Sequence, residues 1–423
     1  DRVAGRRAAR GCAAARTLRV ACRSWGPLLL LALPLGCPSE SEDPPPPAAP
    51  AWCDDGRAGY DWDPRRSAPL RTLPDDHFLL PDPSTRTGWR VHLEPDQNEA
   101  LLAELPPGWL PTFDQLSTLD GWGLTAGVVF RFAFTLNAAT VTPDAVALIA
   151  FEPDGPVRYG VDIEITDFPD TVILRPQRPL PPATQAVAMV LSTARSSDGS
   201  CVRQPVALRE RLSPSTELPG GASAHVLAPR FAAGLAAMDL DPADVVAMTV
   251  FTTQSTPLQD VAVAERVRAE TYAATAPFVC APAGGDRLRC EGTIEVLDFR
   301  DAAGVIPAAS NPEPLGSYAL PVTVWVPGPI AEGPYPVAMF GHGLVSGRGE
   351  GSGAASQLAE IGYAVIASDA LQHGDHPRRT ASDDPPRQTL EFFGIESNPV
   401  RIDGLMLRDH FRQSAWDRLQ VIE

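Results

Sequence analysis

Two short turns combine glycine with residues that could take part in acid, base or electrostatic catalysis. The first turn is Gly341-His342-Gly343-Leu344, and the second runs from Asp369 through His373 to Gly374. Backbone N–H groups held rigidly at a glycine turn can stabilise the negative charge that develops on a carbonyl oxygen during acyl transfer. The sequence therefore indicates an oxyanion-binding turn. A tight loop that binds nothing is the simpler alternative.

A strand, a helix and a second strand are expected to position these turns. The short apolar runs at 337–340 and 363–367 favour parallel strands that are buried on both faces. Between them, apolar residues from Ala354 to Ile361 recur at helical spacing, and Gly362 is placed to end that helix. We expect a right-handed βαβ unit that carries both turns at the C-terminal ends of its strands.

These turns and the unit between them resemble the α/β-hydrolase family, in particular its bacterial esterases and lipases. The resemblance implies that the Leu344 N–H is the oxyanion donor and that His342 and Gly343 shape its turn. It also implies a structural turn beside the substrate mouth, made of Asp369, His373 and Gly374. Asp375 and His376 are expected to face that mouth or solvent.

A second stretch of the same resemblance lies in the predicted helix 407–422, where Phe411, Ala415, Leu419 and Ile422 form one apolar stripe. Arg412-Gln413 and Asp417 resemble an R-Q-x-x-x-D helix that precedes the nucleophile strand. This helix occurs in secreted bacterial lipases with an N-terminal Ig-like region, including lysophospholipase-like surface lipoproteins. Arg412 and Asp417 could pair on the helix surface, or each could simply face water.

The chain is predicted to be multidomain: an N-terminal all-β, Ig-like sandwich region followed by the first part of an α/β-hydrolase with a mostly parallel sheet. Short strand-like runs separated by Pro, Asp and Gly favour the sandwich. They lie at 127–134, 145–151, 160–165, 171–174 and 179–191. The expected order is a signal peptide (1–37), a Pro-rich linker (38–66), an Ig-like β domain (67–205), a mixed α/β connecting region (206–305) and the N-terminal half of the hydrolase domain (306–423).

The first 37 residues are typical of an export signal. Arginines between Arg2 and Arg23 precede an apolar core at 27–35, which is far shorter than the ~20 residues that a membrane span needs. The core ends in Leu35-Gly36-Cys37, which resembles a lipoprotein signal with Cys37 as the lipidated residue. A plain signal peptide with another cleavage point is the alternative. Either form predicts an exported protein, at the cell envelope, on the outer-membrane surface or secreted.

Four cysteines remain once Cys12, Cys22 and Cys37 are set aside, and an even number in an oxidising compartment favours two disulfides. Cys280 and Cys290 flank a glycine turn and are expected to pair across a hairpin. Cys53 would then join Cys201. A zinc site is the rival, but the chain has no C-x-x-C motif.

The net charge of −17, with no lysine among the 35 basic residues, argues against a nucleic-acid partner. The predicted partners are a small-molecule or lipid ester and a membrane reached through the lipid anchor. His373 to His376 matches half of an H-x-H-x-D-H dinuclear metal motif, but Leu371 stands where its first histidine belongs. We therefore predict no metal and no cofactor.

No G-x-S-x-G nucleophile motif occurs in the 423 residues. Ser346 and Ser352 lie in glycine-rich sequence that does not form a strand-to-helix elbow, so neither is predicted to be the nucleophile. The function predicted by resemblance is a serine esterase or lipase that works through an acyl-enzyme, with serine, acid and histidine beyond residue 423. A surface binding or adhesion lipoprotein with a degenerate hydrolase domain is the alternative, and a peptidase on the same fold is a third.

Overall fold

The computed structural model describes residues 53, 57–59, 72–93, 106–166, 171–212, 221–308, 311–380 and 383–423. All of them belong to the compact unit Pro50–Glu423. The predicted signal peptide with Cys37 lies outside the described residues, as does most of the predicted linker. Within the described residues, no helix is long and apolar enough to cross a membrane.

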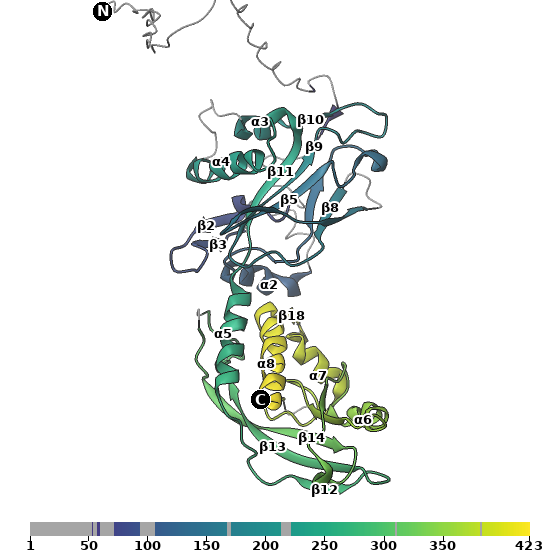
Figure 1. The fold of residues 1–423 in the computed structure, drawn as a ribbon. Coiled ribbons are helices and arrows are strands. Elements are labelled where there is room, and N and C mark those ends of the chain that lie inside the picture. The colour runs from purple at the N-terminus through teal and green to yellow at the C-terminus, as the bar shows by residue number, and fades with distance from the viewer. Residues whose placement is uncertain are drawn as a thin grey trace, which may run out of the picture. The chain divides into compact units, whose positions relative to one another are not determined.

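Two small antiparallel sheets form the N-terminal part of this unit (Figure 1). The larger has the order β11-β9-β5-β6, from Val245–Thr252, Gln185–Leu191, Val146–Glu152 and Gly155–Arg158. The smaller has the order β4-β8-β7, from Val128–Arg131, Thr171–Pro176 and Val161–Ile165. Side chains from both sheets share one hydrophobic core. The strand-like runs of the sequence therefore form strands close to where their patterns place them.

The prediction of an Ig-like sandwich is wrong. The strand β11 lies at the edge of the larger sheet although it comes well after residue 205, and all eight of its residues are buried. Two helices, α3 (Val206–Leu212) and α4 (Gly221–Ala236), come before β11 in the chain, and α4 packs on β11 and β9. Gly234 permits this close packing, because a Cβ at that position would lie 2.6 Å from the Met248 side chain. Periodicity identified the strands, but it could not show which later strand would pair with them.

A five-stranded sheet with the order β12-β13-β14-β16-β15 forms the C-terminal part. Its strands are Val279–Pro282, Leu288–Asp298, Gly316–Val326, Ala364–Ser368 and Val337–Phe340, in that spatial order. Only β15 and β16 pair in parallel, and the other three pairings are antiparallel. The predicted mostly parallel sheet is therefore wrong. Short apolar runs indicate burial, but they do not determine the direction in which a strand pairs.

The strand β15 also differs from its expected burial on both faces. It is an edge strand of the described sheet, and its Val337 side chain is 59% exposed. Helix α6 (Gly351–Ala359) connects β15 to β16 and packs on β16 and β14. The predicted strand–helix–strand order is thus present, but as one parallel pair at the edge of a mainly antiparallel sheet.

The two faces of this sheet are covered by different helices. Leu320 and Val322 of β14 pack with Val421 of helix α8 (Gly404–Ile422), whereas Trp325 packs with Ala355 of α6. Side chains along a strand alternate between faces, which explains how one strand serves both cores. Helix α5 (Thr256–Ala269) lies beside α8, and α7 (Pro385–Phe392) also contacts α8 (Figure 1).

The buried face of α8 is mainly polar and does not follow the apolar stripe seen in the sequence. Phe411 and Ile422 of that stripe are 53% and 59% exposed. Gln413 is fully buried instead, where it accepts from the Phe299 N–H at 2.9 Å and donates to the Leu297 carbonyl at 2.9 Å. The helix therefore satisfies backbone groups of β13 and of the segment after it, which an apolar side chain could not do.

The remaining elements are short. Two-stranded pairs are formed by β1 with β10 (Arg57–Ala58, Val202–Arg203), β2 with β3 (Leu79–Pro81, Trp89–Val91) and β17 with β18 (Ile395–Ser397, Val400–Ile402). Helix α2 spans Leu110–Gln115. Short 3-10 helices lie at Asp76–Phe78, Pro107–Trp109, Leu116–Thr118, Ala138–Thr140, Pro242–Asp244, Ile330–Glu332 and Arg348–Glu350.

Both predicted disulfides are present: Cys53 pairs with Cys201 and Cys280 with Cys290. The second joins directly opposed residues of β12 and β13. Such bonds persist in oxidising compartments and are compatible with an extracellular or cell-surface protein.

Candidate functional site

The two glycine turns of the sequence meet at the ends of β15 and β16. The His342 ring joins them, because its Nε2 accepts from the Ala370 N–H at 2.9 Å. Its Nδ1 lies 2.8 Å from the Gly343 carbonyl, so Nδ1 carries the proton and donates. The ring is thereby fixed as the neutral tautomer. The His342 ring is thus hydrogen-bonded to both turns, and its part in an oxyanion loop stays a prediction.

Gly343 and Leu344 form the exposed tip of this turn. A Cβ at Gly343 would meet no atom within 4 Å, and the Leu344 side chain is 53% exposed. Within the described residues, neither backbone N–H donates to a protein acceptor. The next residue, Val345, has φ +59°, which is rare for a β-branched residue. Such backbone strain costs roughly 1–3 kcal/mol and clusters at functional sites.

Asp369 anchors the second turn and also the segment at Arg348 that follows the first turn. Its buried carboxylate accepts from the Arg348 N–H at 2.6 Å and from the Asp375 N–H at 3.0 Å, and it also pairs with the Arg348 guanidinium. Gly374, at φ +50°, lies so close to the Asp369 carboxylate that a Cβ there would clash. Asp369 and Gly374 thus lie in contact within the second turn, and their place beside a substrate mouth stays a prediction. Arg348 was missed, because nothing near it in sequence indicates a carboxylate partner.

His373 is buried beside the ring of His342, with the ring centroids 5.2 Å apart. Its Nδ1 lies 2.9 Å from the Leu371 carbonyl, and its Nε2 has no hydrogen-bond partner within the described residues. The Nδ1 contact joins two residues of the second turn.

His376 was expected at the substrate mouth or in solvent, and this expectation is wrong. It is 1% exposed, and its Nε2 lies 3.3 Å from the Asp417 carboxylate. Asp417 also accepts from the Tyr318 hydroxyl at 2.7 Å, and burial together with Asp417 raises the Tyr318 pKa well above its usual value. Asp417 is therefore not the surface partner of Arg412, whose guanidinium pairs with Asp260 at 2.7 Å.

Around the two turns, a neutral His342 ring lies near the positive charges of Arg348 and Arg418. Burial lowers the pKa of His342 below 6.5, so its ring is neutral near pH 7. Burial also acts to lower the pKa of Arg348, but Asp369 and Asp375 outweigh it and the pKa is raised. Arg418 of α8 lies under the start of the turn, since a Cβ at Gly341 would be 3.4 Å from its Cζ. The Arg418 charge was not predicted from sequence.

The two serines set aside in the sequence do not form a nucleophile elbow. Ser352 lies inside α6, and the Ser346 Oγ is buried without a hydrogen-bond partner among the described residues. Neither serine has a hydrogen-bonded histidine there to act as its base. Within the same residues, no group of three His, Cys, Asp or Glu side chains could hold a metal ion.

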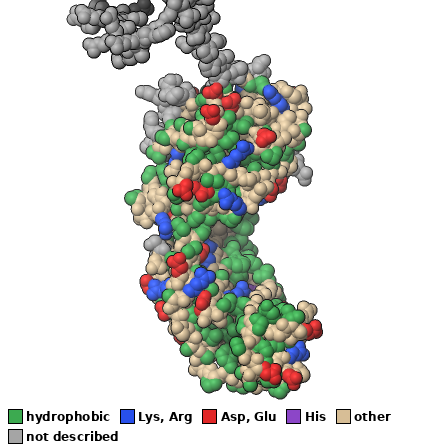
Figure 2. Space-filling view, in the orientation of Figure 1, with side chains coloured by type: hydrophobic (Ala, Val, Ile, Leu, Met, Phe, Trp, Pro, Cys, Tyr) green, Lys and Arg blue, Asp and Glu red, His purple; other side chains and the backbone are tan. Residues whose placement is uncertain are grey.

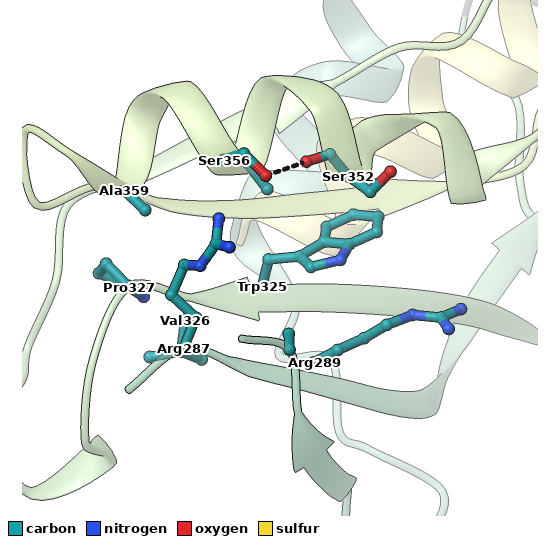
Figure 3. Close-up of a pocket in the computed structure, with 10 residues that line it drawn as sticks. Arg287, Arg289, Trp325, Val326, Pro327, Ser352, Ser356 and Ala359 are labelled. Carbon is teal, nitrogen blue, oxygen red and sulfur yellow. Dashed lines mark hydrogen bonds between the residues drawn. The ribbon is translucent and has the colours of Figure 1, made fainter. Parts of the chain in front are cut away.

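A small cavity of about 200 Å³ lies between α6 and the end of β14. Figure 3 shows the Trp325 indole below α6, with Ser352 and Ser356 on the helix and Arg287 and Arg289 on the β13 side. Arg289 pairs with Glu291 at 2.5 Å, and the Arg287 Nε donates to the Gly284 carbonyl at 3.1 Å. The cavity is smaller than the ~300–1,000 Å³ of ordinary ligand pockets, so it is a weak candidate for a substrate site.

No protein-family model matches this chain, and no curated protein matches it either. Among solved structures, it is similar to the N-terminal part of the bacterial S-layer protein SbsC, at 7% identity and a TM-score of 0.16. The match covers 47% of this chain and 48% of that one, so the chain spans about half the length of that structure. A TM-score of this size does not indicate a shared fold.

The assignment to the α/β-hydrolase family is therefore wrong. No family model supports it, and the sheet that was expected to be mostly parallel is mainly antiparallel. The local turn sequences carried the resemblance, but glycine turns after strands occur on many folds.

Proposed function

We propose that this protein is an exported ester hydrolase in which the Gly343-Leu344 turn binds the oxyanion of the reacting ester. The proposal is carried by one observation: the N–H of Leu344 is uncommitted at the exposed tip of a turn that His342 and Asp369 hold from two sides. It depends on this local geometry and on no family membership.

The chemistry follows from where charge develops. When a nucleophile attacks an ester carbonyl, the oxygen becomes an oxyanion, and a rigid N–H donor stabilises it more than it stabilises the neutral ester. Val345 in the left-handed region and the His342–Ala370 hydrogen bond fix the turn before substrate arrives. Arg418 adds a nearby positive charge. The proposed nucleophile is a serine outside these 423 residues, activated by a histidine and an acid.

The test uses the protein encoded by the complete reading frame and p-nitrophenyl butyrate as the ester. Leu344→Pro removes the N–H, whereas Leu344→Ala keeps it and serves as the matched control. Loss of one oxyanion donor lowers kcat by about 10²–10³-fold, so we expect that loss for the proline variant and less than about tenfold for alanine. Thermal unfolding must show that both variants fold. Equal activity of the two folded variants would refute the proposed donor.

We also propose that Cys37 carries a lipid that holds the protein at a membrane surface, and that the substrate is a small-molecule or lipid ester. The two disulfides support export in general but not the lipid in particular. Mass spectrometry of the protein from its native membrane tests the anchor at Cys37. If the complete protein hydrolyses no ester, the surface-binding function becomes the better hypothesis.

A further inference from the structure

A cleft of about 900 Å³ lies away from the glycine turns, between the β2–β3 hairpin, the start of α5 and the first turn of α8. Its volume falls in the usual range for ligand pockets. Three arginines line it from two elements: Arg86 and Arg90 from the hairpin and Arg408 from α8. Figure 2 shows basic and acidic side chains interspersed on one face of the described residues.

The guanidinium groups keep N–H donors for a ligand. Arg86 is exposed and has no ion pair or side-chain hydrogen bond among the described residues. Arg90 uses Nε for Asp82 at 2.5 Å and Nη1 for backbone carbonyls, which leaves its Nη2. Arg408 uses Nε and Nη2 for Asp409, each at 2.7 Å, which leaves its Nη1.

Asp120 is the one carboxylate among the lining residues, and it is already committed. It accepts from the Ser255 N–H at 2.9 Å and from the Ser255 hydroxyl at 2.6 Å. A negatively charged ligand in the cleft would therefore meet guanidinium donors rather than a carboxylate without hydrogen bonds. Charge-assisted hydrogen bonds from Arg to an oxyanion are among the stronger polar contacts in proteins.

The rest of the lining combines five hydroxyl side chains with the apolar Val305, Ile306 and Leu405. The hydroxyl of Thr85 donates to the Trp89 carbonyl at 2.8 Å, and that of Thr118 donates to the Gln115 carbonyl at 2.7 Å. Each oxygen therefore has lone pairs left to accept from a ligand hydroxyl. Guanidinium donors beside hydroxyl acceptors match a molecule that carries both an oxyanion and many O–H groups.

We propose that this cleft binds a carbohydrate that bears a phosphate or carboxylate group. The Arg86 side chain supplies the main contact to the oxyanion, and the threonines accept from the sugar hydroxyls. The site is separate from the proposed ester-hydrolysis turn, so either proposal can fail without the other.

The test is calorimetric titration of the purified chain with glucose 6-phosphate, glucuronate and uncharged glucose. We expect at least one of the two charged sugars to bind, glucose to bind at least about tenfold more weakly, and added salt to weaken binding of the charged sugars. Arg86→Ala should lower their affinity about tenfold or more, because it removes a charged donor that has no ion pair or side-chain hydrogen bond among the described residues.

The matched control is Arg195→Ala, which removes an exposed arginine outside the cleft. It should bind like the parent protein, and thermal unfolding should show both variants folded. If neither charged sugar binds, if glucose binds as tightly as they do, or if Arg86→Ala binds them unchanged, the site is not the one proposed.

Discussion

The Nε2 atom of His342 accepts a hydrogen bond from the backbone N–H of Ala370 at 2.9 Å, across 28 positions of sequence. One imidazole ring thus fastens the loop after β15 to the loop after β16. The same ring donates to the Gly343 carbonyl, next to the N–H that we propose for the oxyanion. Its charge state should therefore affect the shape of the turn.

We expect His342→Ala to lower the free energy of unfolding by about 1–3 kcal/mol, because it leaves the part-buried Ala370 N–H without its acceptor. His342→Gln, with an oxygen that can replace Nε2, should cost less. Urea denaturation at pH 7 measures both. A cost for alanine no larger than for glutamine would argue against the joining role.

The same ring predicts a dependence on pH. Burial lowers the pKa of His342 in the folded state, whereas the unfolded chain titrates near 6.5. Its contribution to stability is therefore present above pH 6.5 and is lost as the pH falls towards the lower folded pKa. The stability difference between the parent protein and His342→Gln should shrink over that interval. A difference that stays constant from pH 7 to 5 would contradict this expectation.

For Asp76 we expect the opposite dependence of stability on pH. It accepts from Thr252 N–H and hydroxyl groups at 2.8 and 2.6 Å and pairs with Arg230, yet its burial is the stronger influence and raises its pKa from 3.8 to about 6. The folded state thus holds this proton where the unfolded chain has lost it. Stability contributed by Asp76 should fall as the pH rises from about 4 to about 6.

The measurement is the free energy of unfolding of the parent protein minus that of Asp76→Asn, across this pH range. Other titrating groups cancel in the difference, and asparagine does not titrate. A flat difference would show that Arg230 and Thr252 compensate the burial fully and leave the carboxyl ionised throughout.

Gln413 is predicted to contribute more stability than any apolar residue could at its position. Gln413→Leu should cost about 1–3 kcal/mol, because the buried Phe299 N–H loses its acceptor, whereas the Leu297 carbonyl still accepts from Gln420. Phe411→Ala, on the exposed side of the same helix, is the control and should cost less. Urea denaturation compares the two variants. A larger loss of stability for Phe411→Ala than for Gln413→Leu would mean that the apolar stripe is the packing face of the helix.

The two disulfides should differ in their effect on stability. They close loops with sequence separations of 148 and 10 residues. The chain-entropy relation then gives about 5 kcal/mol for Cys53–Cys201 and about 3 kcal/mol for Cys280–Cys290. Denaturation of the paired Cys→Ala variants tests this order. A larger loss for the shorter loop would mean that strand pairing, not loop closure, sets the effect.

Local structure could be predicted from the sequence where the pattern is local. The strand β5 begins and ends within one residue of the apolar run at 145–151, and α5 begins one residue before Pro257, as proline at a first helical turn indicates. The disulfide partners also followed from spacing and number. The sequence alone thus determined most strands and the bond between Cys280 and Cys290.

Only the tertiary structure decided which strands pair, which helix face is buried and which side chains meet. The apolar stripe of α8 failed because Gln413 and Asp417 satisfy buried polar groups more than 90 positions away in the chain. The parallel sheet failed because β14 pairs antiparallel to β16, a choice that apolar periodicity does not encode. The positions of Arg348 and Arg418 beside the two turns also depend on contacts between residues far apart in the chain. Contacts of this kind depend on the satisfaction of distant backbone and charged groups, which no local pattern of residues records.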